Sequence, residues 1–243
     1  MTMARQAALA LRRHRAVIAA LLIVFVECTV APGVSAHGVS SKDARFLLSI
    51  DGVAFIPLMY LGAKHMVTGY DHLLFLVGVI FFLYRLKDIM LYVSLFTVGH
   101  SVTLLAGALG GVRANSYLID AIIGLSIVYK AFENMGGFRR VLGFQPNTRA
   151  AVLIFGLFHG FGLATKLQEF SLSRNGLVAN IVSFNAGVEI GQCLALTAVL
   201  LALGYWRARA GYLRHAYVTN AALMTAGFVL TGYQLTGFVM AGR

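Results

Sequence analysis

Six ionisable or amide side chains lie inside stretches of sequence that are otherwise apolar enough to cross a membrane: Asp71, His72, His100, His159, Asn185 and Glu189. A titratable group at bilayer depth is costly, so it persists mainly where it faces another polar group, water or a bound ion. Imidazole and carboxylate together suit first-row divalent ions, whereas a Cu(I) pathway would be built on Cys and Met. The pattern therefore predicts a buried polar site, with metal binding as the leading hypothesis.

The composition indicates an integral membrane protein. Of the 243 residues, 59% are hydrophobic and only 12% are charged, and the mean hydropathy is +0.79, which fits no ordinary soluble domain. The formal charge of +11 comes from basic residues in short loops between apolar runs, not from a basic patch with interleaved aromatics. Binding to nucleic acid is therefore not expected.

Residues 1–36 are predicted to be a cleavable export signal. A basic start, an apolar run over 16–26 and the sequence Val34-Ser35-Ala36 are typical of such a signal, and the apolar run is short for a membrane span. Cleavage would place His37 at the mature N-terminus, either as a candidate metal ligand or as the first residue of a flexible tail. An uncleaved signal anchor is the alternative.

The rest of the chain predicts an all-α fold, a polytopic membrane helix bundle of about six transmembrane helices after the signal. Residues 37–66 are expected to be a periplasmic lead followed by a helix over about 55–66, which is either an interfacial helix or the outer extension of the first span, and residues 67–243 a six-helix transmembrane domain. Each span is near the roughly 20 residues needed to cross the hydrocarbon. The spans are predicted at 67–84, 89–109, 116–134, 150–168, 177–204 and 216–239.

Two cues give the same orientation. An exported N-terminus makes 85–88, 135–149 and 205–215 the inner loops, and these loops contain most of the basic residues between the spans, as the positive-inside rule expects. We therefore expect a multi-pass protein of the bacterial inner (cytoplasmic) membrane with a periplasmic mature N-terminus.

With this orientation the polar residues fall in one layer in the outer half of the bundle. Asn185 and Glu189 are four residues apart and share a helix face. His65 and His72 are seven apart and would stack on a continuous helix, unless Gly69 interrupts it. Weaker or supporting partners in the same layer would be Ser101, Thr103 and Gln192.

Glycine spacing predicts close helix packing beside this layer. Gly156 and Gly160 flank His159 with GxxxG spacing, and Gly187 and Gly191 flank Glu189. Asp120 is expected to be an interfacial carboxylate, with a place in the polar layer as the alternative. Lys130 and Glu133 are expected to be a snorkelling interfacial group and its neighbour.

Four ordered motifs resemble the HupE/UreJ family, whose members are bacterial membrane proteins associated with hydrogenase and urease systems and regarded as nickel or cobalt permeases. The resemblance covers roughly residues 45 to 240. The motifs are Gly69-Tyr70-Asp71-His72-Leu73-Leu74-Phe75, Phe96-Thr97-Val98-Gly99-His100-Ser101-Val102-Thr103-Leu104, Phe155-Gly156-Leu157-Phe158-His159-Gly160-Phe161-Gly162 and Phe184-Asn185-Ala186-Gly187-Val188-Glu189-Ile190-Gly191-Gln192.

The resemblance implies a His-x5-Asp-His metal motif, which His65, Asp71 and His72 match residue by residue. It also implies a permease for Ni²⁺, or for Co²⁺ as the second candidate, with a hydrogenase, a urease or another metalloenzyme as the system served. The hydrogenase-linked branch has two histidines and a glutamate in one short run, whereas here only His159 and, well downstream, Glu189 correspond to parts of it.

Two other functions are open to the same residues. One is an accessory protein that delivers metal to a metalloenzyme, and the other is an intramembrane metal-dependent hydrolase that uses Glu189 or Asp71 as general base. The chain lacks His-Glu-x-x-His and the nucleotide-binding motif G-x-x-x-x-G-K-[ST]. No organic cofactor is expected, and the protein is not expected to be an enzyme.

Overall fold

The computed structural model describes residues 50–112, 114–169 and 175–242, and every regular element in these ranges is a helix. The predicted signal at 1–36 and His37 lie outside the described residues. The helices are α3 (Phe55–Thr68), α4 (Tyr70–Ile80), α5 (Leu86–Gly110), α6 (Ser116–Asn134), α7 (Gly137–Leu142), α8 (Thr148–Glu169), α9 (Leu177–Arg207) and α10 (Tyr212–Ala241).

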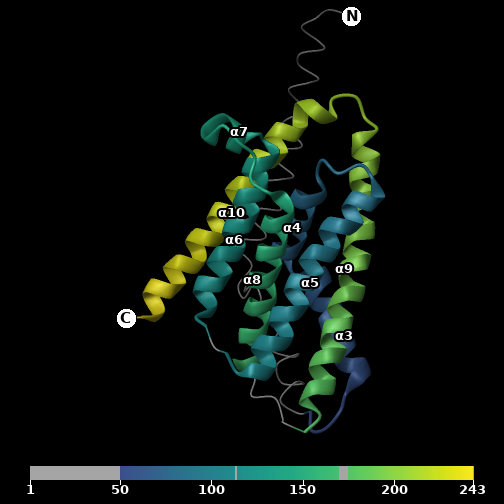
Figure 1. Ribbon diagram of the computed structural model, residues 1–243, viewed down its shortest axis with the longest axis vertical. Helices are drawn as coiled ribbons and strands as arrows, with labels where there is room; N and C mark the ends of the chain where they lie inside the picture. Colours follow the sequence, from purple (N-terminus) through teal and green to yellow (C-terminus); the bar gives the residue numbers. More distant parts are fainter. Residues whose placement is uncertain (1–49, 113, 170–174, 243) are drawn as a thin grey trace, which may run out of the picture.

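The all-α membrane fold is confirmed, with an approximate count of spans. Within the described ranges, four helices are long and apolar enough to cross a membrane by themselves, namely α5, α8, α9 and α10, and α4 is apolar but shorter. These long helices run along the length of the molecule (Figure 1). The chain is a multi-pass membrane protein, and the predicted number of about six spans is approximate.

Glycine lets the helices pack as three close pairs, α3 with α9, α5 with α8 and α6 with α10. A Cβ on Gly160 of α8 would lie 2.0 Å from the carbonyl oxygen of His100 on α5, and one on Gly124 of α6 would lie 2.9 Å from the backbone nitrogen of Thr231 on α10. Such distances are possible only for glycine, so small residues set these crossings. The predicted role of the glycines beside His159 is confirmed.

α3 and α4 follow one another along α9. A Cβ on Gly187 would lie 1.9 Å from the carbonyl oxygen of Met59, and one on Gly191 would lie 2.5 Å from that of Ala63, so α3 runs parallel to α9. Arg207, the last residue of α9, donates hydrogen bonds to the carbonyl oxygens at the end of α4. α3 thus packs along α9, and the C-terminal end of α4 contacts the C-terminal end of α9.

The helix boundary in this region lies at Gly69, between α3 and α4. Residues 55–66 were expected to form an interfacial helix or the outer extension of the span over 67–84, and no helix boundary lies between residues 66 and 67. The segment over 55–68 packs lengthwise against α9, and the chain breaks at Gly69 instead. Backbone atoms at such a break are tolerated at membrane depth only where protein or a water-filled cavity surrounds them.

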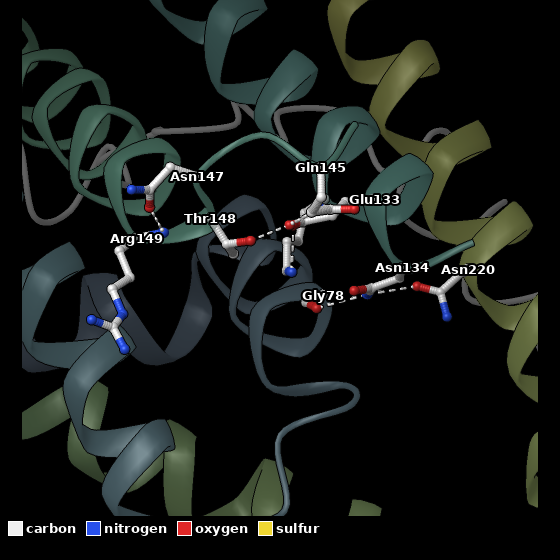
Figure 2. Close-up of polar contacts among 9 residues, drawn as sticks. Gly78, Glu133, Asn134, Gln145, Asn147, Thr148, Arg149 and Asn220 are labelled. Atoms are coloured by element: carbon white, nitrogen blue, oxygen red, sulfur yellow. Dashed lines mark hydrogen bonds and ion pairs between the residues drawn. The ribbon is translucent and has the colours of Figure 1, made fainter. Parts of the chain in front are cut away.

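One end of the bundle gathers the C-terminal ends of α4, α6 and α9 with the start of α8 and α10, and we call it the α7 end because α7 lies there (Figure 1). Asn134 of α6 donates to the carbonyl oxygen of Gly78 on α4 and to the amide oxygen of Asn220 on α10, at 2.8 Å each (Figure 2). By the positive-inside rule this end is predicted to face the cytoplasm.

Lys130 and Glu133 are buried at the α7 end, so the expectation that they snorkel into the interface is wrong. Their side chains form an ion pair of 2.6 Å, with relative exposures of 7% and 8%. The other carboxylate oxygen of Glu133 accepts hydrogen bonds from Gln145, at 2.7 Å, and from Thr148 (Figure 2). A full set of donors around one carboxylate makes its burial tolerable.

Candidate metal-binding site

The break between α3 and α4 creates the local geometry of the site. Gly69 has an extended backbone, with φ −71° and ψ 98°, and its N–H still donates to the carbonyl oxygen of His65 at 2.8 Å. A Cβ at this position would lie 2.9 Å from the carbonyl oxygen of His65, 3.1 Å from Nδ1 of His72 and 3.2 Å from Oδ1 of Asp71. Position 69 therefore favours glycine, because the carbonyl oxygen of His65 and two polar side chains of α4 lie against it.

Four histidines from four helices meet beside this break. The ring centre of His72 on α4 lies 5.3 Å from that of His65 on α3, 5.9 Å from that of His100 on α5 and 5.0 Å from that of His159 on α8. His72, His100 and His159 are at most 1% exposed, as is Asp71, whereas His65 is half-buried. His72 is the centre of the cluster.

Hydrogen bonds orient two of these rings. Asp71 Oδ1 accepts from the backbone N–H of His72 at 2.9 Å and from its ring Nδ1 at 3.1 Å. His159 Nδ1 donates to the carbonyl oxygen of Phe155 at 2.7 Å. With Nδ1 as the donor, the lone pair of a neutral ring lies on Nε2 in both residues. A carboxylate or carbonyl on one ring nitrogen is the usual arrangement behind a metal-binding histidine.

The rings pack edge to face instead of directing their nitrogens at one point. The planes of His72 and its three neighbours are inclined by 77°, 71° and 69°. Within the described ranges, no three His, Cys, Asp or Glu side chains are arranged so that they could hold one metal ion as they stand. The histidines predicted from the sequence are therefore together, in a packed arrangement.

Asn185 and Glu189 form a separate pair on α9. Asn185 donates from its side-chain amide to Glu189 Oε1 at 3.4 Å, which agrees with their shared helix face. Asn185 is buried, but Glu189 is exposed on the outside of the bundle. The contribution of α9 to the histidine cluster is Phe184, whose ring centre lies 6.4 Å from that of His65.

The supporting polar residues connect helices. Thr103 of α5 donates to the carbonyl oxygen of Leu157 on α8 at 2.7 Å, and Thr97 of α5 donates to Gln192 of α9 at 3.0 Å. Asp120, expected at the interface, is 4% exposed and lies 4.0 Å from Lys166 of α8. These contacts fix the positions of the histidine-bearing helices α5 and α8 relative to each other and to α6 and α9.

Phenylalanines surround the histidine cluster, and sequence reasoning missed them. Phe75 and Phe96 each lie within about 5 Å of His159, with ring-centre distances of 5.2 and 5.0 Å. Their sequence signal is a spacing of three or four residues from a histidine on the same helix. That spacing is common in apolar helices, so it becomes informative only once the helices are placed.

Gly69→Ala is expected to disturb the site while leaving the bundle folded. The added methyl group would crowd the carbonyl oxygen of His65 as well as the side chains of His72 and Asp71, so the contact between His72 and Asp71 should lengthen and the tautomer of His72 should no longer be fixed. We expect at least about a tenfold loss of metal affinity, as for other changes behind a ligand, measured by titration of the purified protein with Ni²⁺. Gly111→Ala is not a matched control, because Gly111 has φ +65°; Gly110→Ala, which meets only the far end of Val112, is the better one.

The sequence profile of the family described as HupE / UreJ protein matches residues 41–242. The chain belongs to the HupE/UreJ family. Neither the curated proteins nor the solved structures contain a significant match to it. HupE/UreJ proteins form an accessory and transport family linked to metal handling and associated with hydrogenase and urease maturation. Membership therefore gives this chain a metal-related accessory or permease role.

Proposed function

We propose that the protein is a permease that binds and translocates a divalent transition metal ion, Ni²⁺ as the first candidate and Co²⁺ as the second. The observation that supports this most strongly is the cluster of four histidines at the break in the α3–α4 span. A buried ionisable cluster inside a membrane domain favours an ion pathway, and the family is linked to metal handling.

The ring spacing suits a shared ion. Imidazoles bound to one metal through bonds of about 2.0–2.1 Å have ring centres roughly 5 Å apart. His72 lies 5.3 Å from His65 and 5.0 Å from His159. Rotation of the side chains, without a large movement of the helices, would turn Nε2 of these rings to a common centre. Imidazole nitrogen is a good ligand for Ni²⁺, Co²⁺, Zn²⁺ and Cu²⁺, so the rings alone do not select among them.

The break between α3 and α4 would provide a binding site for the ion at membrane depth. In many transporters the substrate site is formed where a membrane helix is interrupted, because the ends of the two half-helices offer unpaired backbone groups and oriented dipoles. Here the last turn of α3 carries His65 and the first turn of α4 carries Asp71 and His72. The carboxylate at the start of α4 is favoured by the helix dipole and supplies negative charge for a cation.

In this proposal His65, Asp71 and His72 capture the ion, and His100 and His159 hold or relay it. Asn185 and Glu189 take part as a second, more exposed station on α9, where the carboxylate attracts the cation. The membrane potential would drive inward movement, since it is worth about 2.3 kcal/mol per charge per 100 mV.

Uptake of radioactive Ni²⁺ by proteoliposomes tests the proposal. We expect uptake by the wild type, with Co²⁺ as the strongest competitor among Co²⁺, Zn²⁺ and Cu²⁺. His72→Ala and His159→Ala should each lower uptake at least about 100-fold, because loss of a ligand should cost no less than loss of its support. His215→Ala is the matched control, since His215 is half-buried on α10, outside the histidine cluster, and its ring Nδ1 donates to the carbonyl oxygen of Gly211. Equal uptake by all four proteins would exclude this site.

Metal delivery to a metalloenzyme is the second candidate, favoured by the association of the family with hydrogenase and urease maturation. A delivery protein would bind Ni²⁺ through the same histidines but would pass none across the bilayer. Binding that depends on His72, together with absence of flux in sealed vesicles, would support this candidate over the permease.

A further inference from the structure

Each of three buried histidines has a phenylalanine one helix turn nearer the α7 end. Phe75 follows His72 by three residues on α4, which runs towards that end, whereas Phe96 and Phe155 precede His100 and His159 by four on α5 and α8, which run away from it. The three helices therefore place their aromatic rings in one layer, directly on one side of the histidine cluster.

The three rings contact one another through Phe75. Its ring centre lies 5.3 Å from that of Phe96 and 5.8 Å from that of Phe155. Phe75 is 2% exposed and Phe96 is 5% exposed. The layer also touches the histidines, with Phe96 6.3 Å from His72 between ring centres. An ion held by the histidines would meet apolar rings on the way to the α7 end.

A small apolar cavity lies beside this layer. It borders His72 and extends along α4 past the aromatic layer, and its lining includes His72, Phe75, Leu76, Val79, Val93 and Phe96. The cavity has room for about one water molecule, so the side chains beside Phe75 and Phe96 are not packed tightly against these two rings. A turn of the Phe75 ring, together with a shift of the side chains around the cavity, would join the histidine cluster to the side of the layer nearer the α7 end.

We propose that Phe75, Phe96 and Phe155 form the hydrophobic gate of the ion pathway, with Phe75 as the moving part; this rests on the permease function proposed above. A constriction lined only by apolar rings excludes water and so blocks ions, and it conducts when the rings separate. The histidines would then set which ion binds, and the aromatic layer would decide when it passes.

The test measures ion leakage and metal binding in the same purified variants. In proteoliposomes loaded with KCl, Phe75→Ala should raise the passive K⁺ leak at least about tenfold over wild type, because removing the ring lets water through. Phe155→Ala should also leak, and it is the safer variant because Phe155 is only half-buried. Both variants should bind Ni²⁺ with an affinity within about threefold of wild type, since the histidines are unchanged.

Phe81→Ala is the matched control. Phe81 is fully buried but lies in a second cluster at the α7 end, packed on Trp206 and Tyr212, so the control should lower thermal stability without any leak. Equal leakage in wild type, Phe75→Ala and Phe155→Ala would overturn the gate, as would leakage in Phe81→Ala to the same extent. Failure of the wild type to take up Ni²⁺ would instead count against the permease, because the K⁺ leak does not depend on the cargo.

Discussion

Gly187→Ala is expected to destabilise the protein strongly, whereas the same change at Gly204 of the same helix should stabilise it slightly. A Cβ at position 187 would lie 1.9 Å from the carbonyl oxygen of Met59 and 2.7 Å from its carbonyl carbon. Backbone meets backbone there, so α3 and α9 must separate at a cost of about 3 kcal/mol or more. A Cβ at Gly204 meets nothing within 4 Å, and alanine favours the helix by about 0.5–1 kcal/mol.

Thermal stability can be compared by heating the detergent-purified variants and measuring, by size-exclusion chromatography, the fraction of protein that remains monodisperse. The eluted protein is detected by the fluorescence of Trp206, the single Trp of the chain. Gly187→Ala should lose its folded fraction at a clearly lower temperature than wild type, and Gly204→Ala at an equal or higher one. Indistinguishable midpoints for the two variants would contradict the close approach of α3 to α9.

Gly187→Ala should also affect the proposed metal-binding site. α3 carries His65 on the same helix as Met59, so a shift of α3 away from α9 moves His65 relative to His72. We therefore expect any Gly187→Ala protein that folds to bind Ni²⁺ less tightly than Gly204→Ala. In this way the glycines are part of the geometry of the proposed site, although none of them can bind a metal.

Glu133→Gln is expected to be the second strongly destabilising change. One carboxylate oxygen pairs with Lys130, while the other accepts from Gln145 and Thr148. A glutamine has one acceptor oxygen, so its NH₂ group would face either the ammonium of Lys130 or these two donors. Breaking a buried pair in this way costs about 3–5 kcal/mol, which should lower the midpoint of thermal unfolding by on the order of 10 °C.

A double variant separates the charge from the packing. Lys130→Met combined with Glu133→Gln removes both charges and lets the amide oxygen accept from Gln145 and Thr148, with its NH₂ group beside an apolar side chain. Replacement of a buried ion pair by neutral groups is often close to neutral, so the double variant should recover most of the lost stability. A double variant as unstable as Glu133→Gln would show that the cost lies in packing, not in the unpaired ammonium.

The local properties of the chain could be predicted from the sequence. Its class as an all-α membrane protein follows from apolar composition, because a backbone in lipid must satisfy its hydrogen bonds within each helix. The residues of the histidine cluster stand out for the same reason: polar groups in apolar helices need partners. The glycines beside His159 and Glu189 predicted close packing, since only a missing side chain permits it.

The contacts between particular helix faces could be assigned only from the tertiary structure. Lys130 and Glu133 look like interfacial residues until α8 brings Thr148 to the carboxylate, and Glu189 looks like a cluster residue until α9 turns it outwards. Helix crossings between segments far apart in sequence likewise decide two other features. These are the lengthwise packing of α3 against α9 and the layer of Phe75, Phe96 and Phe155. Helical periodicity fixes which residues share a face, but the partner of that face is decided by non-local packing.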